Sequence, residues 1–519
     1  MKFLLSITSL LIASSAIGQL GVVQSSASQS DHYTLFHPHN NTNTYLIDDS
    51  GALLHQWDGI YPPGNTVALL PNKQLFRTGK IENDSFRAGG LGGYMELVDF
   101  DGNVSWSFTL SNANEAFHHE AIFLENGNIL AIVWEAISED EAIQMGRDPA
   151  SLDDQGFWAE KIVEMRPIGT NDMEIVWEWR AKDHLIQNFD PSKDNYSDVV
   201  NPHKLDINYV KEKNKVDWIH LNSIDYLESL DLILLSSPFF NEIWIIDHST
   251  TAEEAKASTG GDYDLGGGLL YRWGNPVTYD QGSVEDQRLF GQHNAQFVLE
   301  NGELGVLLYN NGVDRPEGVY SSIDFFVTPF TVNDGFAKMS DSPFAPSNVD
   351  WSLTAEVKED LYSRIVSGVQ VLPTGNFFIT EGINGRLIEM DSTGTILWEY
   401  QSPHGSSETL LTQFHCEESE SFNPSIIFRA SKIAPDFIGL EEGLVPTTML
   451  EDLNCPLGIK QVENRIITVF TTNGTILKTF FLASDKKINT EDLPKNRLLI
   501  IRENINGLIT SRKIIVRNN

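Results

Sequence analysis

The sequence predicts an all-β fold, a six-bladed β-propeller followed by a small C-terminal β-sandwich. Three observations predict it: a hairpin turn between apolar runs recurs along the chain, an apolar strand ending in tryptophan recurs beside it, and helical periodicity is almost absent. Repetition of one short β unit is typical of propellers, whose blades are four-stranded sheets of about 40–50 residues.

The first recurrent unit is a turn, often of Asn-Gly type, between two β-prone runs. Such pairs are the strongest short-range signal for a β-hairpin. Each copy therefore predicts two neighbouring strands of one blade. The copies are LLPNKQLFRT (69–78), FLENGNILAI (123–132), LESLDLILLS (227–236), LENGELGVLL (299–308) and VLPTGNFFIT (371–380).

The second unit is a strand that ends in tryptophan, often after Asp and Gly. Alternation of apolar and polar residues in ILWEY and IVWEW has the period of a strand. The alternative fold is a pair of β-sandwiches, but the repeated tryptophan strand favours a propeller, with its domain over residues 19–445. The copies are IDDSGALLHQW (47–57), DFDGNVSWSF (99–108), NDMEIVWEW (171–179), GGGLLYRWG (266–274) and DSTGTILWEY (391–400).

The two units alternate at intervals of roughly 50 to 100 residues, so several blades must carry inserted loops. Segments rich in Asp, Gly, Pro and Ser fill the gaps, a composition that favours surface loops. The predicted insertions are residues 135–160, 180–216, 249–290 and 313–360.

The first residues, MKFLLSITSLLIASSAIGQL, have the pattern of a secretory signal peptide over residues 1–18. Lys2 precedes a short apolar run, and Ala16-Ile17-Gly18 forms a small-x-small cleavage site. No run of about 18 apolar residues follows, so no transmembrane segment is expected. We therefore expect a protein that is exported through the periplasm and is secreted or held at the cell surface.

The last segment, residues 446–519, differs from the rest of the chain in charge and in pattern. Pro456 to Asn519 holds eleven Lys and Arg against five Asp and Glu, whereas the whole chain has a net charge of -36. ITVFTTNGTILKTF (467–480) and DLPKNRLLIIRENINGLITSRKIIVRN (492–518) predict short antiparallel strands joined by Asn-Gly turns. The tail resembles the C-terminal sorting domain of type IX secretion, which implies that the secretion machinery is a partner.

Composition excludes several classes of function. A surface this acidic repels nucleic acid and anionic membranes. The two cysteines, Cys416 and Cys455, can form one disulfide in an oxidising compartment or remain two thiols. No cysteine or histidine lies at metal-ligand spacing beside them, and the Asp-rich loops lack EF-hand spacing, so no metal is expected.

Motifs for common enzyme chemistries are also missing. We find no nucleophile elbow, P-loop, zincin motif or dinucleotide fingerprint in a fitting context. The Asp-Gly-Trp strands are similar to those of quinoprotein propellers, but the adjacent cysteine pair of that class is missing, and no cofactor is expected.

Three histidines precede hairpin turns by comparable distances. His119 lies seven residues before Asn126, while His220 and His293 lie eight before Glu228 and Asn301. The innermost strands of a propeller line its central channel, so residues at one phase are expected at one channel mouth. The competing interpretation is that each histidine only caps its blade with a hydrogen bond.

Longer stretches resemble the bacterial arylsulfate sulfotransferase (ASST) family over residues 30–440. The resemblance implies a six-bladed propeller that moves a sulfuryl group from a phenolic sulfate to a phenol through a sulfated histidine, without 3′-phosphoadenylyl sulfate. The matching stretches are YTLFHPHNNTNTYLIDDSGALLHQW (33–57), FHHEAIFLENGNILAIVWE (117–135), DWIHLNSIDYLESLDLILLSSPFFNEIWIIDHSTT (217–251), GGGLLYRWGNP (266–276), LFGQHNAQF (289–297), NNGVDRPEGVYSS (310–322) and SGVQVLPTGNFFITEGINGRLIEMDSTGTILWEY (367–400).

The resemblance implies roles for individual residues. His220 and His293 match the family's sulfate-contacting and acid–base histidines, and Arg315 matches its anion-holding arginine. Sulfuryl transfer needs N–H or cationic donors around the sulfate oxygens and a group that titrates near the phenol. Two neighbours, Asn222 and His118, are therefore further candidates for sulfate binding.

One expected histidine is missing. The family's nucleophilic histidine falls in the stretch matching LYSRIVSGVQVLPTGN (361–376), where Ile365 or Val366 occupies its place and Arg364 lies beside it. Three possibilities follow: His119 is the nucleophile, sulfate passes directly to the acceptor, or transfer is lost and anion binding is kept. An additional arginine at 364 suits the last two, so the alternative function is a non-catalytic propeller that binds a sulfated ligand.

Overall fold

In the computed structural model, the described residues are 20–152, 156–210, 216–337, 342–404 and 425–437, with the backbone of five short strands between 447 and 515. The chain divides into two compact units, residues 1–411 with 420–452, and residues 412–419 with 453–519. The predicted signal peptide and both cysteines lie outside the described residues. In the part that is described, no helix is long and apolar enough to span a membrane.

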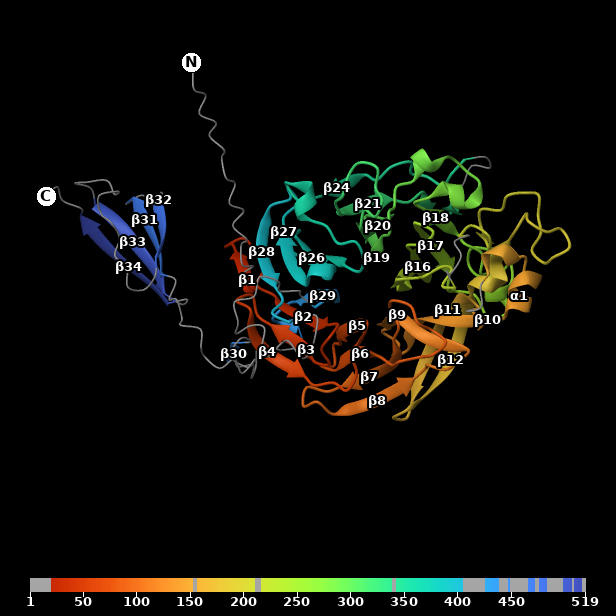
Figure 1. Cartoon of the computed structure of the whole chain (residues 1–519), viewed down its shortest axis with the longest axis horizontal. Helices are drawn as coiled ribbons and strands as arrows, with labels where there is room; N and C mark the ends of the chain where they lie inside the picture. Colours follow the sequence, from red (N-terminus) through yellow and green to blue (C-terminus); the bar gives the residue numbers. More distant parts are fainter. Residues whose placement is uncertain are drawn as a thin grey trace, which may run out of the picture. The chain divides into compact units, whose positions relative to one another are not determined.

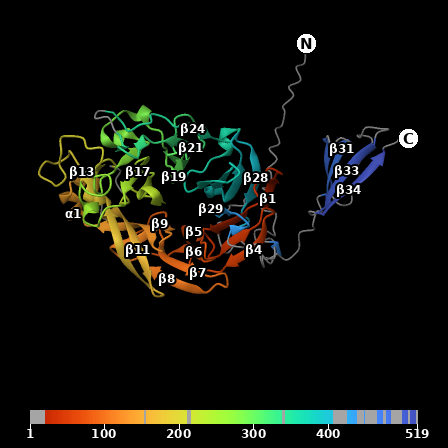
Figure 2. The same cartoon turned by 180° about the vertical axis from the view of Figure 1, so that it is seen from behind.

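The larger unit is a six-bladed β-propeller, as the sequence predicts, and each blade is an antiparallel sheet. Figure 1 shows the blades following one another in chain order around a ring, with β5, β9, β19 and β29 toward its centre, and Figure 2 shows the same ring from behind. From the inner strand outward, the blades are as follows: blade 1, β29 (Ile427–Ile433), β2 (Tyr33–Pro38), β3 (Thr44–Ile47), β4 (Ala52–Trp57) and β30 (Thr447–Thr448); blade 2, β5 (Pro63–Leu69), β6 (Leu75–Lys80), β7 (Gly93–Val98) and β8 (Val104–Thr109); blade 3, β9 (Glu115–Phe123), β10 (Ile129–Ile137), β11 (Phe157–Ile168) and β12 (Asp172–Arg180); blade 4, β15 (Ser223–Leu227), β16 (Leu232–Ser237), β17 (Glu242–Asp247) and β18 (Tyr271–Trp273); blade 5, β19 (His293–Glu300), β20 (Glu303–Asn310), β21 (Ser322–Val327) and β24 (Trp351–Leu353); blade 6, β25 (Gly368–Val371), β26 (Phe377–Glu381), β27 (Arg386–Met390), β28 (Ile396–Gln401) and β1 (Gly21–Ser25).

Chain segments far apart in the sequence close the ring. β29 pairs with β2 and supplies the inner strand of blade 1, while β1 pairs with β28 at the outer edge of blade 6. Both joints lie near the chain's two ends, so the first and last blades are tied by backbone hydrogen bonds as well as by packing. The same closure puts Phe428 and Arg429 of β29 at the inner edge of the ring.

Irregular segments connect the blades. One short α-helix, α1 (Glu139–Gln144), lies in the connection from β10 to β11. Two small pairs of strands lie in other connections: β13 (Leu185–Ile186) with β14 (Leu205–Asp206), and β22 (Phe330–Thr331) with β23 (Gly335–Phe336). Short 3-10 helices are Pro149–Ser151, Ala181–His184, Glu228–Leu230, Glu254–Lys256, Pro276–Tyr279, Val284–Asp286, Lys358–Asp360 and Gly382–Asn384.

The recurrent tryptophans join neighbouring blades. Trp57 on the outer strand β4 donates its indole N–H to the Asp99 carbonyl of blade 2 (3.1 Å), and Trp398 of β28 donates to the Asp49 carbonyl of blade 1 (2.7 Å). Trp106 makes the same bond to the Asp172 carbonyl of blade 3 (3.0 Å). The aspartates before these strands form tight turns, because their carboxylates accept from backbone N–H groups two and four residues on. The Asp-Gly-Trp pattern thus encodes a turn and a fastener between blades.

Several inner strands begin with a bulge that bends the backbone at one end of the ring. The register of β9 against β10 shifts around His119, and that of β19 against β20 shifts around Asn294. His119, His220 and Asn294 all have a left-handed backbone, with φ of 51°, 56° and 53°. Such bulges re-aim side chains and are frequent beside active sites. Here they turn the first side chains of the inner strands toward one another.

The smaller unit holds a four-stranded antiparallel sheet in the order β32-β31-β33-β34. Its strands are β31 (Arg465–Thr471), β32 (Ile476–Leu482), β33 (Leu498–Ile505) and β34 (Leu508–Ile515). The hairpins predicted around the Asn-Gly turns of the tail are therefore formed. The described strands of this unit make one sheet, and the second sheet of the predicted sandwich does not lie among them.

Candidate functional site

A cleft of about 790 Å³ opens at the end of the propeller where the inner strands begin. Blades 2, 3 and 4 supply its walls, through the β6–β7 connection, the β10–β11 connection and the segment before β15. Three aromatic side chains line it, Phe157, Trp158 and Phe239, and His220 with Asp217 lies on its surface. Arg87 is the only lysine or arginine among the described residues that line this cleft.

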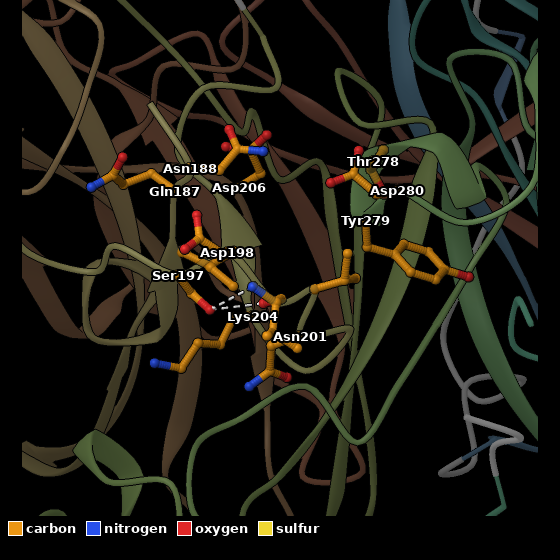
Figure 3. A pocket seen from close by; sticks show the side chains of 13 residues that line it. Gln187, Asn188, Ser197, Asp198, Asn201, Lys204, Asp206, Thr278, Tyr279 and Asp280 are labelled. Carbon is orange, nitrogen blue, oxygen red and sulfur yellow. Dashed lines mark hydrogen bonds between the residues drawn. The ribbon is translucent and has the colours of Figure 1, made fainter. Parts of the chain in front are cut away.

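A smaller pocket of about 50 Å³ lies beside β14 and the 3-10 helix Pro276–Tyr279. Figure 3 shows the polar side chains that line it, among them Ser197, whose hydroxyl contacts the backbone of Val199. That volume suits a few water molecules, each of which needs about 10–15 Å³ of such space. It contains none of the predicted site residues, so the larger cleft is the candidate site.

His220 is held from two sides in the cleft. Its Nδ1 atom bonds the Oδ2 atom of Asp217, and its ring stacks on Phe239 with centroids 4.5 Å apart. The other carboxylate oxygen of Asp217 accepts from the Trp134 indole (3.2 Å). Because a carboxylate only accepts, Nδ1 of His220 carries the hydrogen and Nε2 carries the lone pair. The His220 side chain is 16% exposed.

His118 and His119 form a buried pair beside His220. Their Nδ1 atoms are 2.7 Å apart, so one ring donates and the other accepts. The His119 ring meets the His220 ring edge-on, with centroids 4.5 Å apart. Burial lowers the pKa of both His118 and His119 well below the ordinary value, and the charge that His220 can carry adds to the effect. Both imidazoles are therefore neutral near pH 7.

Close packing fixes both rings. His118 stacks on Trp134 with centroids 3.9 Å apart, and its Nε2 atom lies 3.4 Å from Oε1 of Glu160. His119 lies flat against Gly90, where an added Cβ atom would come within 2.0 Å of the ring. Position 90 therefore requires glycine, both for this approach and for its φ of +85°.

Glu160 links this pair to the backbone that carries His220. Both of its carboxylate oxygens accept from the Leu221 N–H, at 2.9 and 3.0 Å. Burial raises the pKa of Glu160 well above the ordinary value, and the charge of Asp217 raises it further. Two carboxyl groups thus flank the histidines, with the charge favoured on Asp217.

His293 lies outside the lining of the cleft, and both of its ring nitrogens are bonded. Nδ1 donates to Oδ1 of Asn311 (2.8 Å), and Nε2 accepts from the Val366 N–H (3.2 Å). Burial lowers its pKa to about 4, although the bond to Asn311 opposes that effect. The ring therefore stays neutral and ties blade 5 to the start of blade 6. His293 and His119 both contact the ring of Phe428, at 6.3 and 6.1 Å between centroids.

The histidines predicted at one phase occupy two different positions. His119 and Asn294 share the bulge position, eight residues before a turn glycine with positive φ, and His293 precedes that position by one residue. His220 has the same backbone conformation, but the 3-10 helix Glu228–Leu230 lengthens its hairpin. The two arrangements nevertheless direct all three rings toward the inner edge of the ring of blades.

The candidate sulfate-binding residues lie in different surroundings. Arg315 donates to the Ser322 hydroxyl (2.9 Å) and lies over the Tyr320 ring (4.4 Å). Asn222 is buried and donates to the Gln292 carbonyl (2.7 Å). Arg364 is exposed beside the half-exposed Ile365. Of the candidates, only His118 contacts the histidine cluster directly.

Several groups at the site carried no recognised signal in the sequence. Asp217 stands three residues before His220, a spacing that could have been noticed, whereas Trp134 and Glu160 come from a different blade. Arg429 of β29 bonds Glu120, whose other oxygen accepts from the Ile224 N–H (3.0 Å). Its position depends on the closure of the ring, which a local pattern does not reveal.

Comparison with known proteins gives one family and several solved structures. The family model described as Arylsulfotransferase (ASST) matches residues 21–412. No curated protein matches the chain. A protein of unknown function from Bacteroides caccae is 11% identical, with a TM-score of 0.40, over 78% of this chain and 99% of that one.

Two further structures are similar at the same low level. A 6-phosphogluconolactonase-like protein from Bacteroides fragilis is 11% identical over 95% of this chain and 97% of its own, with a TM-score of 0.33. A periplasmic gluconolactonase from Pseudomonas aeruginosa is 10% identical over 78% and 99%, with a TM-score of 0.35.

Proposed function

The chain belongs to the arylsulfotransferase (ASST) family, and on that basis we propose that it transfers a sulfuryl group from a phenolic sulfate ester to a phenolic acceptor. The transfer uses no 3′-phosphoadenylyl sulfate, because the donor ester already carries the sulfuryl group. The observation that carries the proposal is the cleft in which His220, fixed by Asp217, lies among aromatic side chains.

The lining of the cleft suits the two parts of an aryl sulfate. Phe157, Trp158 and Phe239 offer aromatic surface to the phenyl ring, and ring pairs add about 0.5–1.5 kcal/mol beyond area burial. Arg87 offers a positive charge for the sulfate. Its ion pair with Asp84 (2.8 Å) is exposed, so the arginine can exchange that partner at small cost.

The histidines give the chemistry that the transfer needs. A neutral imidazole presents a lone pair to sulfur, and a neighbouring imidazole or N–H group stabilises the charge on the equatorial oxygens. His118, His119, His220 and His293 stay the candidates for these roles. Asn222, Arg315 and Arg364 are retained as candidates for sulfate contact.

The test is release of p-nitrophenol from p-nitrophenyl sulfate by the mature protein, with and without phenol. We expect phenol to increase the rate, and we expect His220→Ala to abolish it. Absence of release above the blank, together with saturable binding of the sulfate ester, would reject transfer.

A second candidate function is a non-catalytic propeller that binds a sulfated ligand. Two observations favour it: Ile365 or Val366 stands where the family places a histidine, and both nitrogens of His293 are occupied. Calorimetric titration with p-nitrophenyl sulfate distinguishes the two functions, because a binder gives a stable isotherm and no product.

Export and attachment complete the proposal. We propose that residues 1–18 direct the chain to the periplasm and that the tail, residues 446–519, is read by type IX secretion. Support comes from the apolar leader and from the reversal of charge in the tail. A fusion of the tail to a reporter, expressed in a strain with and without that machinery, tests the assignment.

A further inference from the structure

His220 differs from the other histidines at the site in the state of its ring nitrogens. His293 has partners on both nitrogens, and the paired Nδ1 atoms of His118 and His119 lie behind Trp134 and Gly90. His220 alone among them lines the cleft, and Asp217 occupies only its Nδ1 atom. In the described part of the chain, no partner is recorded for its Nε2 atom.

We propose that Nε2 of His220 is the nucleophile that takes the sulfuryl group, with Asp217 as its positioning residue. The inference rests on the proposed function and names the covalent group that the missing histidine at 365–366 leaves open. The bond to Asp217 and the stack on Phe239 fix the ring in one tautomer and one orientation. A nucleophilic nitrogen oriented by a third group is the arrangement that covalent catalysis requires.

The transfer balances without a cofactor. In the first step the Nε2 lone pair forms a bond to sulfur as the bond from sulfur to the phenolic oxygen breaks. The electron pair leaves with the phenolate, which takes its proton from solvent. In the second step the acceptor oxygen bonds sulfur, the bond from Nε2 to sulfur breaks with its pair returning to Nε2, and the acceptor's proton passes to solvent.

Asp217 has a defined part in both steps. Sulfurylation of Nε2 places a positive charge on the imidazole ring while Nδ1 keeps its hydrogen. The carboxylate at Nδ1 stabilises that charge, and its second oxygen is held by the Trp134 indole (3.2 Å). Burial and the charge of Asp217 keep a proton on the nearby Glu160, so Asp217 remains the charged member of the pair.

The direct test traps the intermediate. The full-length protein is mixed with p-nitrophenyl sulfate in the absence of an acceptor, quenched at alkaline pH and digested for mass spectrometry. We expect a burst of p-nitrophenol equal to the enzyme concentration and one added SO₃ group on His220. An SO₃ group on His118, His119 or His293, or steady transfer without a burst or an adduct, would overturn the inference.

Variants separate positioning from folding. In Asp217→Asn the amide can donate to Nδ1, which selects the wrong tautomer, so kcat should fall by about 100-fold or more while KM stays near the wild-type value. The matched control is Asp231→Asn, because Asp231 makes a similar bond to His248 (2.6 Å) elsewhere in blade 4. The control should lose stability and keep its kcat.

The outcomes distinguish the two levels of the proposal. If phenol-dependent release occurs while His220→Ala or Asp217→Asn retains wild-type kcat, the nucleophile assignment is wrong and the proposed function stands. If wild-type protein releases no p-nitrophenol, the proposed function fails and the inference fails with it.

Discussion

The imidazole of His119 meets the imidazole of His220 edge-on, with ring centroids 4.5 Å apart, across the boundary between blades 3 and 4. The two residues are 101 positions apart by their numbers, and each has a left-handed backbone at the start of an inner strand. Their contact places a buried neutral pair, His118 with His119, directly behind the histidine that lines the cleft.

Substitution of His220 and of His293 should have opposite consequences. His220→Ala should lower kcat/KM for p-nitrophenyl sulfate by about 100-fold or more and leave the melting temperature nearly unchanged, since its side chain is partly exposed. His293→Ala should lower the free energy of unfolding by about 2 kcal/mol or more, because Asn311 and the Val366 N–H lose their partner in the interior. Urea unfolding and steady-state kinetics on both variants check this, and equal stability of the two would refute it.

Arg87 should act on donor binding. Arg87→Ala removes the positive charge from the described cleft lining, so KM for p-nitrophenyl sulfate should rise about tenfold, or about 1.4 kcal/mol, with kcat unchanged. Arg166→Ala is the matched control, since Arg166 is also an exposed arginine paired with a glutamate, on the outer strands of blade 3. A similar KM for wild type and Arg87→Ala would count against sulfate binding at this position.

The tryptophan fasteners should contribute to stability individually. Trp398→Phe keeps an aromatic ring and deletes the donor to the Asp49 carbonyl, so the free energy of unfolding should fall by about 1 kcal/mol. Trp351→Phe, at a side chain that is 39% exposed, is the control and should change it by less than about 0.5 kcal/mol. Chemical denaturation measures both, and an equal loss in the two variants would argue against the blade-to-blade bond.

His248 should make stability depend on pH. Burial by itself lowers its pKa, but the bonds to Asp231 (2.6 Å) and Glu164 (3.1 Å) outweigh burial and raise it to about 9. Because the folded-state pKa lies above the ordinary 6.5, the stabilisation is complete below about pH 6.5 and is lost as pH rises through about 9. His248→Gln should lower stability at pH 6 by about 1–2 kcal/mol, allowing for the partly exposed Asp231, and should flatten the decline between pH 6.5 and 9. An unchanged decline in the variant would show that another group causes it.

The repeating β units of the propeller were predictable because they are local. The Asp-Gly-Trp strands and the hairpin turns each depend on a few neighbouring residues, and their number and order follow from the sequence. The outer strands β18 and β24 were less visible, since both are only three residues long and lie within or beside segments expected to be loops. Closure by β29 was not predicted, because its pairing with β2 joins residues about 400 positions apart.

The candidate site was predictable only in part. His119 and His220 could be placed together from their phase, but the phase misplaces His293 by one position, because the bulge residue in its strand is Asn294. Spacing also says nothing of hydrogen bonds to distant backbone, which occupy both nitrogens of His293. Asp217 and Trp134 support His220 from different blades, and only the assembled ring brings them together.

The central claim is transfer of a sulfuryl group between phenols in the cleft at His220. It is tested most directly by chromatographic measurement of phenyl sulfate formed from p-nitrophenyl sulfate and phenol, without 3′-phosphoadenylyl sulfate. The account predicts that wild-type protein forms phenyl sulfate in proportion to the p-nitrophenol released, and that His220→Ala forms none above background. Formation of phenyl sulfate at the wild-type rate by His220→Ala, or none by the wild type, would contradict it.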